Sequence, residues 1–206
     1  IAAGCDNSPF GPKQYSGSDA TVRVVDSEGK PVSGAIAIMY WSYMEPNGHS
    51  EHVFDVMEVE ADSNGVIRVP GRGPIITPIG TRMLPHMPQL RVFKPGYLPV
   101  FDQNVTGEYW EEAPPSMPLK WDGQTITLVA VDPQSERYLD QIQALARSMD
   151  FFLAPKQCWS VTFHRMIDVV NVELDEYMPQ DVAGRKIRPN LSGCESVESA
   201  DSRSGE

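Results

Sequence analysis

The chain has 206 residues, of which 41% are hydrophobic and 22% charged, and its 28 acidic against 17 basic residues give a net charge of −11. This length suits one domain with an appended segment. The acidic balance argues against nucleic-acid binding, which needs clusters of Lys and Arg to contact phosphates, and disfavours docking on anionic lipid. No run of 18 apolar residues occurs, so the sequence predicts no membrane-spanning helix.

Small residues open the chain and lead to a cysteine, Cys5. This start is similar to the end of a bacterial lipoprotein signal, in which small residues precede a cysteine that becomes acylated. We therefore expect residues 1–19 to be a lipobox-like start and a flexible linker. The protein is then expected to be exported to the bacterial periplasm or cell surface, with a lipid anchor on Cys5. The alternative is an unmodified cysteine in a frayed terminus.

Short apolar runs separated by turn residues fill residues 20–131, which indicates a β-sandwich. In the run at 34–43 the odd and even positions are both apolar, so this strand is expected inside a sandwich or with one face covered by another element. Asn64-Gly65 predicts a hairpin between the runs at 51–61 and 66–70. The full set of expected strands is 21–26, 34–43, 51–61, 66–70, 90–93, 98–101 and 125–131.

Two long segments rich in proline and apolar or aromatic residues, 71–88 and 102–121, are predicted to be loops. Proline removes a backbone donor, so residues 71–88 are not expected to form an internal strand. Both segments exceed the usual length of a connection, which favours a functional role. The alternative for the aromatic residues is that they cap an open end of the sandwich. The candidate contacts for a partner or a glycan are Met83, Leu84, Met87, Tyr109, Trp110 and Trp121.

The period of the apolar residues changes after residue 131. Asp132 is expected to cap a helix that has Pro133 at its first position. Apolar residues then recur at spacings of three and four between residues 138 and 152, and again between 163 and 177. We therefore expect a two-helix extension over residues 132–178. The polar segment 179–206 is predicted to be disordered.

Three cysteines are an odd number for an exported chain. If Cys5 carries lipid, Cys158 and Cys194 remain as a candidate disulfide that would tie the C-terminal tail to the body of the protein. The alternative is two free thiols, because the sequence does not give their separation.

His49, His52 and Asp55 make the best metal candidate, but histidines in loops are more often solvated, so we expect neither a metal nor a cofactor. Residues 45–62 also hold six acidic residues and no Lys or Arg. They lack the ordered aspartate spacing of a calcium loop. A solvated face of a sheet is the default interpretation of this acidic stretch.

Three segments resemble the carboxypeptidase regulatory-like domain: Val-Asp-Ser-Glu-Gly-Lys-Pro-Val-Ser-Gly-Ala at 25–35, Ala-Asp-Ser-Asn-Gly-Val-Ile at 61–67 and Val-Phe-Lys-Pro-Gly-Tyr at 92–97. The resemblance implies a mostly β chain with a transthyretin-like or Ig-like β-sandwich over 20–131, and an α+β chain overall once the helices are added. It implies no particular activity, because this fold is a scaffold with many uses.

The main functional hypothesis is a non-enzymatic lipoprotein of the cell envelope that binds a protein partner through the two long loops and the helices. No zinc-peptidase spacing and no Gly-x-Ser-x-Gly motif occurs. The first alternative is glycan binding through Tyr109, Trp110 and Trp121. The second is a transthyretin-related hydrolase, although the chain lacks the C-terminal ending of those enzymes.

Overall fold

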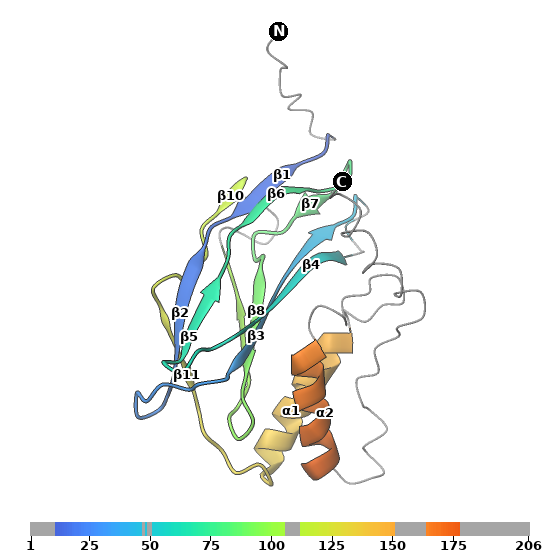
Figure 1. Ribbon diagram of the computed structural model, residues 1–206. Helices are drawn as coiled ribbons and strands as arrows, with labels where there is room; N and C mark the ends of the chain where they lie inside the picture. Colours follow the sequence, from blue (N-terminus) through green and yellow to red (C-terminus); the bar gives the residue numbers. More distant parts are fainter. Residues whose placement is uncertain (1–10, 47, 49–50, 106–111, 151–163, 178–206) are drawn as a thin grey trace, which may run out of the picture.

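The computed structural model describes residues 11–46, 48, 51–105, 112–150 and 164–177. It is a β-sandwich with a C-terminal pair of helices, as the sequence predicts (Figure 1). The strands are β1 (Gln14–Gly17), β2 (Ala20–Asp26), β3 (Ile36–Met44), β4 (Glu51–Glu60), β5 (Val66–Val69), β6 (Arg72–Ile76), β7 (Arg82–Met83), β8 (Gln89–Phe93), β9 (Val100–Gln103), β10 (Ser116–Met117) and β11 (Thr125–Leu128); the helices are α1 (Glu136–Asp150) and α2 (His164–Tyr177).

One layer of the sandwich is the large sheet, in the order β4-β3-β8-β9, with β7 pairing to β3. The opposite layer holds two smaller sheets, β10-β1-β6 and β11-β2-β5. These follow one another along the same side because β1 leads into β2, and β5 into β6, after two residues each (Figure 1).

The central strand β3 is buried on both of its faces. Ala37, Met39 and Trp41 point into the core between the layers. Ile36 and Ile38 point to the other side and pack against the two helices. The sequence predicts that another element could cover one face of this strand, and that element is the pair of helices. The large sheet becomes the middle layer of the molecule at the end that the helices cover (Figure 1).

The helices form where the apolar periodicity predicts them, but α1 starts later than expected. The Ser135 hydroxyl accepts a hydrogen bond from the backbone N–H of Tyr138 at 3.3 Å, so Ser135 is the N-cap. Asp132 instead begins the preceding turn, where its carbonyl accepts from the N–H of Ser135 at 3.0 Å. No helix among the described residues has the length and apolar character needed to cross a membrane.

Three segments predicted as linker or loop contain short strands. Part of the expected linker forms β1, in which Tyr15 is buried. The expected loop 71–88 contains β6 and β7, and the expected loop 102–121 contains β10. Pro74 lies within β6, which is an edge strand, where the missing backbone donor costs no sheet hydrogen bond. The sequence predicts that residues 71–88 form no strand in the interior of a sheet, and β6 agrees with this because it lies at a sheet edge.

The predicted hairpin across Asn64-Gly65 is wrong. The turn itself forms, and Asp62 Oδ1 accepts hydrogen bonds from the backbone N–H groups of Asn64 and Val66, both at 2.9 Å. However, β4 pairs with β3 in the large sheet, and β5 pairs with β2 in the opposite layer. The turn therefore carries the chain from one layer of the sandwich to the other.

Candidate functional site

The predicted contact residues of the loop 71–88 are not on the surface. Met83, Leu84 and Met87 have exposed fractions of 0%, 1% and 0% and belong to the core between the layers. Their apolar side chains are buried because β7 and the turn after it fold across the end of the sandwich. They therefore do not offer a surface to a partner or a glycan, and this prediction is wrong.

Trp121 is also buried, with an exposed fraction of 3%. Its indole Nε1 donates a hydrogen bond to Asp102 Oδ2 at 2.8 Å, which ties its loop to β9. Trp121 thus contributes to packing and offers no open face for a sugar ring. The other predicted residues, Tyr109, Trp110, Cys5, Cys158, Cys194 and His49, and the tail 179–206, lie outside the described residues.

The two described members of the metal candidate have separate partners. His52 Nε2 lies 2.7 Å from Glu45 Oε1, and its ring stacks on Tyr43. Asp55 Oδ2 lies 3.1 Å from Arg72 Nε. Within the part of the chain that the structure describes, no group of three or more His, Cys, Asp or Glu side chains could hold a metal ion.

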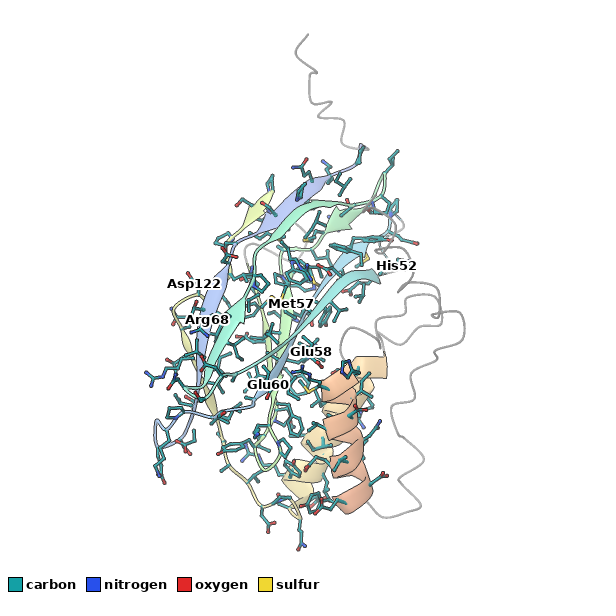
Figure 2. All side chains as sticks on the ribbon, in the orientation of Figure 1. His52, Met57, Glu58, Glu60, Arg68 and Asp122 are labelled. Carbon is teal, nitrogen blue, oxygen red and sulfur yellow. The ribbon has the colours of Figure 1, made fainter. Side chains whose placement is uncertain are left out.

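The acidic stretch is partly exposed, as a solvated face would be, but each of its six carboxylates also has a partner. Glu58 and Glu60 contact the first turn of α2, and Figure 2 shows both beside the helices, away from His52. The pairs are Glu45 with His52, Glu51 with Ser42, Asp55 with Arg72, Glu58 with the Met166 N–H, Glu60 with Arg165, and Asp62 with Arg68.

A depression of about 300 Å³ on the large sheet is the strongest candidate site. It is lined by Arg91 of β8, Phe101, Asp102 and Gln103 of β9, and the nearby Val105 and Lys120. We call it the Arg91 depression. Arg91 lies opposite Phe101 on β9 and opposite Ile38 on β3, so it occupies the face of the sheet that also carries the helices.

The Arg91 guanidinium is held in place by a buried polar network. Its Nη1 donates to the Leu90 carbonyl at 3.1 Å, and its Nη2 donates to Gln89 Oε1 at 2.8 Å and to the Tyr40 hydroxyl at 3.1 Å. Tyr40 in turn donates to Gln89. The guanidinium carbon also lies 5.4 Å from the Tyr40 ring and 5.2 Å from the Phe101 ring, within cation–π distance of each.

Arg91 carries a buried positive charge and at least one unused donor. The side chain is 9% exposed, and its Nε–H has no hydrogen-bond acceptor among the described residues. Burial lowers the pKa of Arg91, an effect that Tyr40 opposes. Burial also raises the pKa of Tyr40 to about 12, so its hydroxyl stays protonated at neutral pH. A buried cation that has no carboxylate partner among the described residues is costly, and the site is therefore suited to an added anion.

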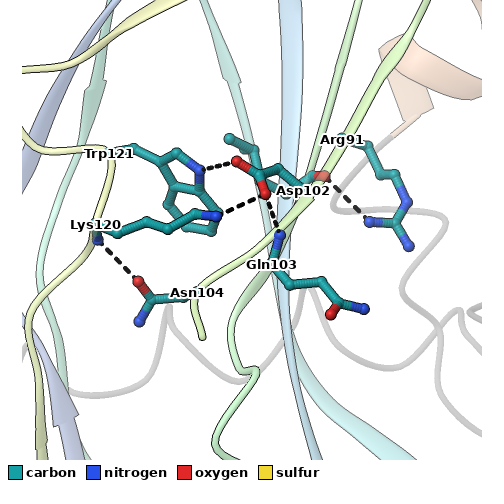
Figure 3. Close-up of polar contacts among 7 residues, drawn as sticks. Arg91, Asp102, Gln103, Asn104, Lys120 and Trp121 are labelled. Atoms are coloured by element: carbon teal, nitrogen blue, oxygen red, sulfur yellow. Dashed lines mark hydrogen bonds and ion pairs between the residues drawn. The ribbon is translucent and has the colours of Figure 1, made fainter. Parts of the chain in front are cut away.

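The rim of the depression is partly charged and partly apolar. Lys120 Nζ lies 2.7 Å from Asp102 Oδ1 (Figure 3). Partial burial raises the pKa of Asp102, but hydrogen bonds from Lys120 and Trp121 outweigh this effect and hold that pKa below its usual value. Phe101 and Val105 are 38% and 59% exposed. With Arg91 and Lys120 against Asp102, the depression carries one net positive charge.

Arg91 is not among the site residues predicted from the sequence, although its strand carries a signal for it. In the run Gln-Leu-Arg-Val-Phe, Leu90 and Val92 face the core between the layers. The alternation of a strand then places Gln89 and Arg91 on the other face. The neighbouring strand β3 is apolar on this face too. A charged residue at this position of β8 is therefore expected to be a buried cation.

No protein-family model matches the chain, and no curated protein matches it. Solved structures similar to it include 3-chlorocatechol 1,2-dioxygenase from Rhodococcus opacus 1CP, with 14% identity, a TM-score of 0.35 and coverage of 57% of this chain and 61% of that chain. Chlorocatechol 1,2-dioxygenase from Pseudomonas putida has 18% identity, a TM-score of 0.35 and coverage of 61% and 62%. The C-terminal domain of the shaft pilin spaA from Lactobacillus rhamnosus GG has 10% identity, a TM-score of 0.26 and coverage of 58% and 99%.

The chain thus spans about three fifths of the length of these two dioxygenases. Likenesses of this strength do not bear on activity, substrate or partner.

Proposed function

We propose that this protein is a non-enzymatic binding domain of the bacterial cell envelope, anchored by lipid on Cys5, and that it binds a carboxylate-bearing ligand in the Arg91 depression. The observation that carries the binding site is the buried Arg91 guanidinium with an Nε–H that lacks an acceptor among the described residues. We also propose that residues 20–131 form a domain of the carboxypeptidase regulatory-like kind, because three of their segments resemble it.

A carboxylate fits the donors that the depression presents. The planar guanidinium matches the geometry of a carboxylate better than a point charge such as an ammonium does. Tyr40 and Gln89 already hold Arg91 in position, so binding orders little side-chain freedom there. The depression is also a locally positive spot on a chain of net charge −11, which favours an anion at this point.

Phe101 controls access to the guanidinium. Its ring lies over Arg91, yet it is more than a third exposed and belongs to the edge strand β9. A ligand reaches the Nε–H when this ring turns toward solvent. Phe101 and Val105 then supply apolar contact for the part of the ligand next to the carboxylate. We therefore propose a ligand with an acidic group beside a small apolar group, such as a segment of a protein partner.

The lining residues are hydrogen-bond donors, one carboxylate and apolar groups, and no nucleophile–base pair occurs among them. This composition favours binding over catalysis. Stacking of a glycan on Trp121 is not supported, because the indole is buried.

Titration with N-acetyl-L-valine and with its uncharged amide tests the binding site. We expect the acid to shift the NMR signals of the Arg91 Nε–H and of the Phe101 ring, and the amide to leave them unchanged. Arg91→Lys should weaken binding of the acid by about tenfold or more, because it keeps the charge and loses the fork of donors. Arg68→Lys on β5 is the matched control and should bind normally. Equal shifts with acid and amide would refute the carboxylate site.

The lipid anchor is tested separately. The protein is expressed from its natural precursor in a Gram-negative host, and membrane and soluble fractions are compared by intact mass. We expect a membrane-bound form that begins at Cys5 and carries a diacylglyceryl group, and a soluble form from Cys5→Ser. A wild-type protein found soluble and unmodified would refute the anchor without affecting the carboxylate site.

A further inference from the structure

Two large apolar side chains stand exposed at the end of β6. Ile76 is 67% exposed and Ile79 is 72% exposed, the highest values among the exposed large hydrophobic residues that the structure describes. They lie close together in sequence, and Pro78 between them is also exposed. A contiguous exposed apolar group of this kind marks a contact surface more often than scattered single residues do. We call these three residues the Ile76–Ile79 tip.

The backbone holds the Ile76–Ile79 tip outward. The side chain of Thr77 is 2% exposed, so it is anchored in the body of the protein between the two isoleucines. Thr81 donates hydrogen bonds to the Pro78 carbonyl from its backbone N–H at 3.1 Å and from its hydroxyl at 2.7 Å. The tip is therefore part of a hydrogen-bonded turn, and its apolar side chains are directed to solvent.

The tip lies beside the start of the sandwich. Ile76 is the register partner of Gln14 at the beginning of β1, and the Thr77 N–H donates to the Lys13 carbonyl at 2.9 Å. Figure 1 shows β1 and β6 side by side at this end of the molecule, with the helices at the opposite end of the sandwich. An anchor on the N-terminal residues would therefore join the sandwich at the same end that carries Ile76 and Ile79.

We infer that the Ile76–Ile79 tip contacts the lipid bilayer that holds the protein, with both isoleucine side chains entering the interfacial region. The inference rests on the proposed lipid anchor. Eight residue steps separate Cys5 from Lys13, and a fully extended chain of that length spans at most about 30 Å. The tip therefore stays within reach of the membrane surface at all times.

The contact is apolar in character. A chain of net charge −11 gains nothing from an anionic surface, so the attraction comes from removing the isoleucine side chains from water. Neither isoleucine alone would hold the protein on a bilayer. The tip therefore acts together with the lipid on Cys5, because stable membrane attachment usually combines two weakly binding elements. We therefore expect the contact to orient the sandwich, with the helices directed away from the membrane.

The test uses the full chain with Cys158→Ser and Cys194→Ser, so that Cys5 is the one thiol, coupled to a maleimide lipid in phosphatidylcholine nanodiscs that contain a nitroxide-labelled lipid. NMR then measures the broadening of methyl signals. We expect strong broadening at Ile76 and Ile79, and none at Val172 of α2, which is 59% exposed and serves as the reference. Broadening that is absent, or equal at all three residues, would overturn the inference.

A second measurement avoids the cysteine substitutions. The lipidated wild-type protein in nanodiscs is compared with soluble Cys5→Ser by amide hydrogen exchange. We expect exchange over residues 75–80 to slow at least threefold in the nanodisc. The Ile76→Ser and Ile79→Ser double variant should lose this protection, and Val172→Ser should keep it. Protection that persists in the double variant would overturn the inference.

The outcomes separate the two proposals. A natural protein without lipid on Cys5 refutes the anchor, whatever the tethered chain shows. A lipidated protein whose tip shows neither broadening nor protection keeps the anchor and refutes the membrane contact. Concentration-dependent dimerisation that Ile76→Ser abolishes, with no broadening in the nanodisc, would assign the tip to a second copy of the chain and also refute the membrane contact.

Discussion

The carboxylate of Glu58 on β4 accepts a hydrogen bond from the backbone N–H of Met166 at 2.8 Å, so a strand of the large sheet caps the first turn of α2. Arg165 pairs with Glu60 on the same strand, also at 2.8 Å. The first N–H groups of a helix have no partner within the helix. In α2 a residue more than a hundred positions earlier in the chain supplies one.

Glu58→Ala should destabilise the protein by about 1 kcal/mol, the usual cost of losing an N-cap. The loss should appear mainly as faster hydrogen exchange in the first turn of α2, because that is where the acceptor is removed. Glu58→Gln keeps an acceptor oxygen and should cost less. The control is Glu28→Ala, since Glu28 pairs with Lys30 in an exposed turn. Equal exchange in all three variants would show that the cap is not formed in solution.

Tyr138→Phe should destabilise the protein by about 1–3 kcal/mol, the range for leaving a buried polar group without its partner. The Tyr138 hydroxyl donates to the buried Glu173 and accepts from the Gly96 N–H at 3.2 Å, so it joins both helices to the turn after β8. Urea unfolding measures the change. Tyr177→Phe, at the more exposed ring that lies edge-on to Tyr138, is the matched control and should cost little. A smaller effect at Tyr138 than at Tyr177 would contradict the network.

Stability should fall as the pH rises through the range just above 4.5. Burial raises the pKa of Glu173 above its usual 4.5, against the opposing effect of the Tyr138 hydrogen bond. In that range the folded protein binds more protons than the unfolded chain, so the contribution is fully present below the unfolded pKa and is lost as the pH passes through the folded pKa. Glu173→Gln should reduce this slope in urea midpoints measured across the range. An unchanged slope would exclude Glu173 as its source.

Gly65→Ala should destabilise the protein more than Gly29→Ala, by roughly 1–3 kcal/mol for the overpacking it creates. Both glycines have positive φ, +71° and +80°, so both substitutions incur the same kind of backbone strain. They differ in space, because a Cβ on Gly65 would lie 2.4 Å from the Val24 carbonyl oxygen, whereas a Cβ on Gly29 meets nothing within 4 Å. Urea unfolding of the two variants isolates the steric part, and equal losses would contradict it.

Much of the framework follows from local pattern alone. The two apolar faces of β3 predict that both sides of this strand are covered, and the structure confirms it with the opposite layer on one side and α1 and α2 on the other. The helical spacing between residues 138 and 152 likewise predicts α1. Such features depend on which face of an element is apolar, and this is a property of neighbouring residues.

Other features depend on which elements meet, and no local pattern contains that information. The turn at Asn64-Gly65 reverses the chain as its residues predict, but whether β4 and β5 then pair is settled by the competing strands β3 and β2. The burial of Met83 and Met87 is likewise absent from the local pattern, because it arises where their segment folds across the end of the sandwich.

The sequence by itself determined both described helices, seven of the described strands, their apolar faces and the acidic balance of this protein. Tertiary structure alone decided that Glu58 of β4 caps α2, that the Arg91 guanidinium lies against Tyr40, and that Ile76 lies next to the start of the sandwich. The physical reason is distance along the chain. Periodicity and turn chemistry act over a few residues, whereas these contacts join segments tens of residues apart and exist only once the layers have packed.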